Sequence, residues 1–104
     1  MSATDEFIIN VAELINAVIH YYIWVIIIAI IATWLVQFNV LDRRNRVVYA
    51  IVDFLFRVTE PALRPIRRRV PFLGGIDFSP FILIVLLTIL QMIIRFIARS
   101  LVGV

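Results

Sequence analysis

The segment at residues 59–80 reads TEPALRPIRRRVPFLGGIDFSP and separates two strongly apolar runs of the chain. It contains four prolines, a pair of glycines and four arginines, a composition typical of a turn rather than of an uninterrupted helix. Proline removes a backbone donor and restricts the residue before it, so it favours helix ends. The segment therefore predicts that the chain reverses direction between the two apolar runs.

The first apolar run, at residues 14–41, contains no charged side chain. As a helix rising about 1.5 Å per residue, residues 21–41 alone extend about 30 Å, the hydrocarbon thickness of a bilayer. Hydrophobic residues make up 63% of the chain, well above the roughly 45–50% of soluble domains. We predict a transmembrane helix over residues 17–41, preceded by an acidic extension and the first helical turns over residues 1–16.

Aromatic side chains lie near both ends of residues 21–41, as they do where a helix meets two headgroup layers. They are Tyr21, Tyr22 and Trp24 at one end and Trp34 and Phe38 at the other. The acidic N-terminus lacks the basic region and the small-residue cleavage site of a secretory signal peptide. We therefore expect the first helix to persist in the mature protein.

The second apolar run covers residues 78–94. Ser79 is a candidate cap for the free backbone donors at the helix start, and Pro80 suits the first helical position. Arg95 and Arg99 follow one turn apart, and their long stems can reach the headgroups from within a span. We predict a second transmembrane helix over residues 80–100, with contact between Arg95 and a partner helix as the alternative to this snorkelling.

The connector over residues 42–79 carries eight arginines and contains a candidate helix. Residues 47–58 are apolar but too short to cross a bilayer. Polar residues in and around them recur on one helical face: Arg46, Asp53, Arg57, Glu60 and Arg64. Asp53 and Arg57 are spaced for an i,i+4 ion pair, and Arg57 and Glu60 for an i,i+3 contact. The pattern predicts an amphipathic helix in the membrane interface.

Two prolines and two glycines predict how this connector ends. Pro61 and Pro65 each remove a backbone donor, so we expect the amphipathic helix to stop there. Gly74 and Gly75 form a candidate turn that returns the chain to the membrane. The connector therefore combines a helix stop, a basic cluster at the headgroups and a tight turn.

Few residues can carry chemistry. The absence of cysteine excludes disulfides and thiolate ligands. The single histidine, His20, is next to Tyr21 and is most simply an interfacial polar residue. No phosphate loop, dinucleotide motif or metal-ligand spacing is present. We predict no enzymatic activity, no cofactor and no metal.

The arginines of the connector are the candidate binding residues for a partner or a lipid: Arg57, Arg64, Arg67, Arg68 and Arg69. Next to a span, basic side chains are attracted to an anionic leaflet. Binding of anionic headgroups is therefore the leading interpretation, and docking of an acidic protein is the alternative. Contact with nucleic acid is not expected, because aromatic residues do not alternate with the arginines.

The run FLFRVTEPALRPIRRRVPFLGGIDFSP at residues 54–80 closely resembles the signature of the YggT/YlmG family of small integral membrane proteins. That signature has an aromatic-Arg-x-Thr-Glu-Pro segment, an Arg-Pro-x-Arg-Arg segment, and Gly-Gly-x-Asp-x-Ser-Pro before a second apolar helix. The matching positions outside the arginines are Glu60, Pro61, Pro65, Gly74, Gly75, Asp77, Ser79 and Pro80, which are candidate structural motif residues.

The resemblance implies an all-α membrane protein in which two transmembrane helices form a hairpin, joined by an amphipathic interfacial helix and a Pro/Arg-rich connector. It also implies a non-enzymatic assembly or scaffold factor in the bacterial cytoplasmic membrane. Family members are linked to cell division, nucleoid distribution and osmotic tolerance, and plastid relatives to thylakoid organisation and cytochrome assembly. Two short spans bury little surface, so we expect a homo-oligomer or a subunit of a larger complex.

Two alternative functions remain open from the sequence. An oligomeric transport or channel subunit would gather the polar residues of the two spans around an axis: Thr33, Gln37, Thr88 and Gln91. Thr88 and Gln91 are also candidates to join the helices by hydrogen bonds. A helper in haem or cytochrome assembly would use His20 as a ligand with a partner.

The charge distribution predicts the orientation of the chain, because short cytoplasmic loops are enriched in basic residues. The eight connector arginines outweigh Arg95 and Arg99, so we expect a cytoplasmic connector and both termini outside. The chain has no cysteine, so Ser2→Cys gives a single thiol. In intact cells this thiol should react with a membrane-impermeant maleimide. Reaction with a permeant reagent alone would show the inverted topology.

Overall fold

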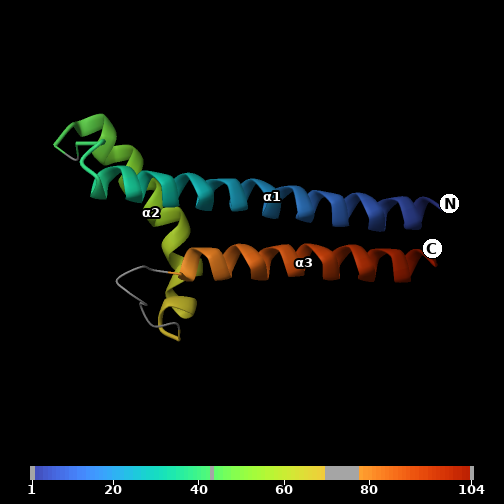
Figure 1. Ribbon diagram of the computed structural model, residues 1–104. Helices are drawn as coiled ribbons and strands as arrows, with labels where there is room; N and C mark the ends of the chain where they lie inside the picture. The colour runs from blue at the N-terminus through green and yellow to red at the C-terminus, as the bar shows by residue number, and fades with distance from the viewer. Residues whose placement is uncertain (1, 43, 70–77, 104) are drawn as a thin grey trace.

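The computed structural model describes residues 2–42, 44–69 and 78–103, which form three helices. These are α1 (Ala3–Gln37), α2 (Arg46–Arg67) and α3 (Ser79–Val102). α1 and α3 lie side by side and antiparallel, with both termini at one end, and α2 crosses them toward the other end (Figure 1). The prediction of an all-α fold with two long apolar helices is confirmed.

Both ends of α1 depend on local backbone chemistry. The Ser2 hydroxyl accepts a hydrogen bond from the Asp5 amide at 3.2 Å, and the Asp5 carboxylate accepts one from the Ser2 amide at 3.4 Å. This capping box starts the helix, and the Ser-x-x-Asp pattern was its signal in the sequence. The helix ends at Gln37 rather than at residue 41, because Asn39 adopts a left-handed φ of 61°.

The prediction that the connector helix ends at Pro61 and Pro65 is wrong, since α2 continues through both to Arg67. The prolines are four residues apart and both exposed, so the bonds they remove lie away from the packed apolar face of α2. There the carbonyls left without an amide donor, those of Arg57 and Pro61, can be solvated. On the inward face, the Thr59 hydroxyl donates to the Leu55 carbonyl at 2.8 Å.

The start of α3 also corrects a prediction. Ser79 is the first residue of the helix and is completely buried, whereas Phe78 occupies the capping position without a capping side chain. A capping serine needs extended backbone so that its oxygen reaches the next amides, and Ser79 is already helical. Pro80 lies in the first turn, as predicted.

A polar contact fixes the register of α1 against α3. The side-chain amide of Gln91 donates to the backbone carbonyl of Asn16 at 3.0 Å, and the side-chain amide of Asn16 donates to the backbone carbonyl of Gln91 at 3.5 Å. The prediction that Gln91 joins the helices is confirmed. The Thr88 hydroxyl instead donates to the Ile84 carbonyl of its own helix at 2.8 Å, so this part of the prediction is wrong.

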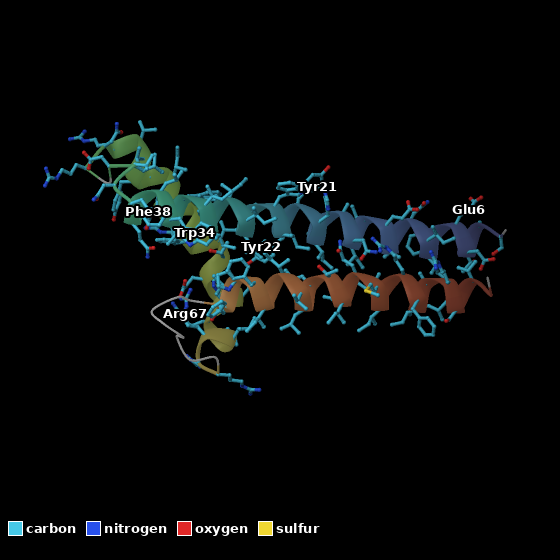
Figure 2. The ribbon with its side chains drawn as sticks, in the orientation of Figure 1. Glu6, Tyr21, Tyr22, Trp34, Phe38 and Arg67 are labelled. Atoms are coloured by element: carbon cyan, nitrogen blue, oxygen red, sulfur yellow. The ribbon has the colours of Figure 1, made fainter. Side chains whose placement is uncertain are left out.

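α1 lies beside α3 already from near its N-terminus, whereas the transmembrane span over residues 17–41 stays a prediction. Residues of α1 between Phe7 and Ile15 line a shallow groove together with the last turns of α3, and Ile26 packs against Leu83 near the start of α3. Tyr21 lies midway along α1, because the helix begins at Ala3 (Figure 2). Contacts between α1 and α3 decide which part of α1 pairs with α3. The charge-free run of α1 by itself contains no information about these contacts.

α2 packs its apolar face against α1 and α3 at two places. Ala29 and Ala32 of α1 contact Val52 and Leu55 of α2. Further along, Leu63 of α2 packs with the residues that already join α1 to α3, Ile26 and Leu83. The alanines have no bulk beyond Cβ, so they let α2 approach the backbone of α1 closely. These contacts fix the angle at which α2 crosses the pair.

The outer surfaces of α1 and α3 are apolar. Side chains such as Trp24 (53% exposed), Ile28 (50%) and Leu101 (64%) keep at least half of their surface exposed. A soluble monomer rarely exposes so continuous an apolar surface. By length and composition both helices can cross a membrane, and few of their residues are buried as in the core helix of a soluble protein.

The hydroxyl of Tyr22 joins α1 to α2 by donating to the Val58 carbonyl at 2.9 Å. Because a net intramolecular hydrogen bond contributes about 1 kcal/mol, Tyr22→Phe should lower the free energy of unfolding by about that amount. Tyr21→Phe is the matched control, since Tyr21 is 69% exposed. Reversible unfolding in mixed micelles, followed by circular dichroism, measures both. Equal effects of the two substitutions would contradict the assignment.

Candidate functional site

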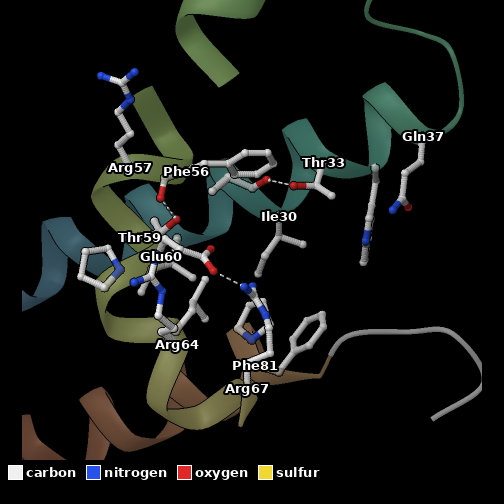
Figure 3. A pocket seen from close by; sticks show the side chains of 16 residues that line it. Ile30, Thr33, Gln37, Phe56, Arg57, Thr59, Glu60, Arg64, Arg67 and Phe81 are labelled. Carbon is white, nitrogen blue, oxygen red and sulfur yellow. Dashed lines mark hydrogen bonds and ion pairs between the residues drawn. The ribbon is translucent and has the colours of Figure 1, made fainter. Parts of the chain in front are cut away.

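A pocket of about 710 Å³ lies where the three helices meet, and we call it the junction pocket (Figure 3). The last turns of α1 form one wall, the second half of α2 forms another, and the start of α3 closes it. Its polar lining consists of Thr33 and Gln37 from α1 and of Arg57, Thr59, Glu60, Arg64 and Arg67 from α2. Its apolar lining includes Ile26, Ile30, Phe56, Leu63 and Phe81.

The sequence of α2 places charged side chains and apolar side chains on different faces. Val52, Leu55, Thr59 and Leu63 are the buried residues of this helix, at spacings of three and four. Such spacing defines one stripe of a helix. The arginines and Glu60 fall beside that stripe, so the second half of α2 presents them to the pocket and to its outer side.

Two ion pairs form among the described residues of α2, and Figure 3 shows the one between Glu60 and Arg67. Arg57 pairs with Asp53 at 2.9 Å, which confirms the predicted i,i+4 pair. The predicted contact between Arg57 and Glu60 is wrong, because Glu60 pairs with Arg67 instead. In Figure 3 the guanidinium of Arg57 points away from Glu60, whereas Arg67 reaches back two turns toward Glu60.

The remaining arginines of the predicted cluster divide into two groups. Arg64 lines the junction pocket, while Arg68 and Arg69 follow the end of α2 and lie outside it. All three are exposed. Within residues 2–42, 44–69 and 78–103, no carboxylate forms an ion pair with any of them. The cluster therefore offers unneutralised positive charge both inside the pocket and on the outer surface.

The other predicted motif residues have different positions. Pro61 and Pro80 line the pocket, Pro65 is exposed on the outer face of α2, and Ser79 is buried at the start of α3. Gly74, Gly75 and Asp77 lie outside the described residues.

Sequence reasoning missed part of the pocket. It considered Thr33 and Gln37 only as lining for a pore, and it assigned no site role to Trp34 or Phe81. The four-residue spacing of Thr33 and Gln37 places them on one face of α1, but nothing local shows that this face meets the arginines of α2.

The histidine shows no ligand arrangement. His20 is exposed, and its ring packs edge-on against Tyr21 at 5.5 Å and Trp24 at 6.5 Å between centroids. It does not line the junction pocket. In the part of the chain that the structure describes, no three His, Cys, Asp or Glu residues are grouped closely enough to hold a metal ion.

The pair formed by Glu60 and Arg67 should stabilise α2 more than the pair formed by Asp53 and Arg57. The side chains of Glu60 and Arg67 are each 32% exposed, whereas that of Arg57 is 79% exposed and screened by solvent. Double-mutant cycles in mixed micelles with Gln and Asn substitutions should give a coupling energy of about 1 kcal/mol for the first pair. The second pair is the control and should give less than about 0.5 kcal/mol. Equal coupling in both would contradict the geometry.

The sequence matches the family described as CCB3/YggT over residues 8–98. It is 39% identical over 69 residues to "Uncharacterized protein YggT" of Escherichia coli (strain K12), covering 66% of this chain and 32% of that protein. It is 34% identical over 84 residues to an uncharacterized protein of Haemophilus influenzae, covering 81% of this chain and 40% of that protein. This chain thus spans well under half of the length of both relatives.

No solved structure matches the chain. The family match, by contrast, extends from the first third of α1 through α2 to the last turn and a half of α3, and so includes every helix that lines the junction pocket. The chain belongs to the CCB3/YggT family.

Proposed function

We propose that this chain is a non-enzymatic assembly or scaffold factor of the bacterial cytoplasmic membrane. α1 and α3 cross the bilayer, and α2 lies at its cytoplasmic surface, where its arginines bind anionic headgroups and dock a partner protein. The observation that carries the proposal is the placement of α2. Its apolar face packs on α1 and α3, and the helix, which carries the arginines, lies at the end of the molecule opposite both termini (Figure 1).

Helix lengths support this placement. The 24 residues of α3 extend about 36 Å at about 1.5 Å per residue, enough to cross a hydrocarbon layer of about 30 Å. The 35 residues of α1 extend about 52 Å, more than one crossing requires. The turns of α1 beyond the start of α3 therefore project past the hydrocarbon layer, alongside the arginines of α2.

The exposed surface supports a partner. Only Ile26, Ala29 and Ala32 are buried among the described residues of α1, so a single chain offers a small core. Arg68 and Arg69 add exposed positive charge at the end of α2. A second copy or a larger membrane complex would cover apolar surface, and an acidic partner would neutralise the arginines. Cell division, nucleoid distribution and assembly of a membrane complex are the processes in which we place this role.

The polar residues of the spans favour a scaffold over a channel subunit. The Thr33 hydroxyl donates to the Ala29 carbonyl and the Thr88 hydroxyl to the Ile84 carbonyl, both at 2.8 Å and within one helix. Gln91 is held between α1 and α3 by its bond to Asn16. Three of the four polar side chains that a pore would need are thus engaged inside a single chain.

A photo-crosslinking residue at Arg68 tests the docking role in native membranes. Arg68 is exposed and lies outside the packed contacts, whereas Ile66 packs against the core. We expect capture of one specific protein from this position and not from Ala50, an exposed control on the same helix. Mass spectrometry of the adducts identifies the product. Adducts with lipid or with the chain itself alone would contradict a docking role.

A further inference from the structure

We propose that the junction pocket is a specific site for one anionic glycerophospholipid. The phosphate binds Arg64 and Arg67, and the glycerol and the start of an acyl chain occupy the apolar part of the pocket. This inference rests on one part of the proposed function, namely that α2 lies at the level of the lipid headgroups. It goes further by assigning a single ligand to the junction pocket, in addition to general attraction between arginines and a leaflet.

The size and lining of the pocket fit an amphiphile. Its volume of about 710 Å³ lies within the range of about 300–1,000 Å³ that small-molecule sites occupy. Charged groups of α2 form one side, and Ile26, Ile30 and Phe81 form another. A free anion would leave this apolar surface uncovered, and a wholly apolar ligand would leave Arg64 without an acidic partner among the described residues.

The charges select a phosphate. Glu60 offsets the charge of Arg67, but Arg64 has no acidic partner among the described residues, so the lining retains a positive charge. Guanidinium groups bind phosphate oxygens through paired hydrogen bonds. Figure 3 shows Arg67 with Glu60 at the pocket, facing Ile30 and Thr33 across it. A phosphate beside Arg64 would thus neutralise the lining arginine for which the described residues provide no carboxylate.

The remaining polar groups suit the glycerol region of such a lipid. Gln37 lines the pocket from the last turn of α1, and its amide can donate to an ester carbonyl. The Thr33 hydroxyl already donates to Ala29 but keeps lone pairs that accept a hydrogen bond. The phosphate of the lipid would then meet the arginines, the ester groups would meet Gln37 and Thr33, and the acyl chain would meet the apolar side chains.

Native mass spectrometry of the purified full chain in detergent tests the site, because it counts bound lipids without needing a partner. Phosphatidylglycerol is compared with phosphatidylcholine of identical acyl chains, and inorganic phosphate and glycerol phosphate serve as competitors. We expect one phosphatidylglycerol per chain and about tenfold weaker binding of phosphatidylcholine. Neither water-soluble competitor should displace the lipid at millimolar concentration, because neither covers the apolar surface.

Two charge variants separate the pocket from the surface. Arg64→Gln should weaken phosphatidylglycerol binding about tenfold, as expected for loss of a charge-assisted hydrogen bond. Arg68→Gln removes the same charge from outside the pocket and should change binding less than twofold. Arg64 is exposed and makes no ion pair in the described chain, so its substitution should leave the helical spectrum and melting temperature unchanged.

A third variant fills the pocket without a change of charge. Thr33→Phe should abolish the single bound lipid, whereas the Arg68→Gln protein retains it. The comparison holds when the helical spectrum of the Thr33→Phe protein matches that of the parent. If Thr33→Phe does not fold, Arg64→Gln decides alone. Equal losses in Arg64→Gln and Arg68→Gln, absence of a single bound lipid, or displacement by inorganic phosphate would each overturn the site.

The two proposals fail separately. Lipid binding in detergent does not depend on a partner, and crosslinking from Arg68 does not depend on the pocket. Loss of the lipid site with a captured partner would leave the scaffold role intact. A bound lipid without a captured partner would leave the pocket as a lipid site and remove the docking role.

Discussion

The close packing of α2 against Ala29 and Ala32 of α1 is the constraint on which the rest of the structure depends. Small side chains at these positions let Val52 and Leu55 approach the backbone of α1. That contact sets where the second half of α2 crosses, so Leu63 reaches the place where α1 meets α3. The junction pocket is the space left beside this crossing, between the last turns of α1 and the start of α3.

The prolines of α2 act in a different way from proline at a helix end. Both are on the exposed face, where the backbone groups that they leave unpaired can be solvated, while inward packing holds the helix together. Continuation through Pro61 and Pro65 carries Arg64 and Arg67 onto the same helix as Glu60. A helix that stopped at Pro61 would leave these arginines in a turn, without a fixed relation to the pocket.

The arginines that look alike in the sequence have distinct surroundings. All three line the pocket, but Arg57 is paired with Asp53, Arg67 is paired with Glu60, and Arg64 has no acidic partner in the described chain. In the two roles that we propose, one basic segment would hold a lipid in the pocket and dock a protein on the outside. The Gln91 contact with Asn16 keeps α1 and α3 in register beneath both.

The sequence by itself determined the two apolar helices, the amphipathic character of α2 and the pairing of Asp53 with Arg57, because all of these depend on neighbours within about one turn. The tertiary structure alone decided the features that depend on distant residues. The bond from Tyr22 to Val58 joins positions 36 apart, and the contact of Asn16 with Gln91 joins positions 75 apart. Packing between the helices also allows α2 to continue beyond its prolines. The same packing brings Thr33 and Gln37 of α1 to the arginines of α2. A periodic pattern reports which face of a helix is apolar, but only packing between helices decides which residues of another helix that face meets.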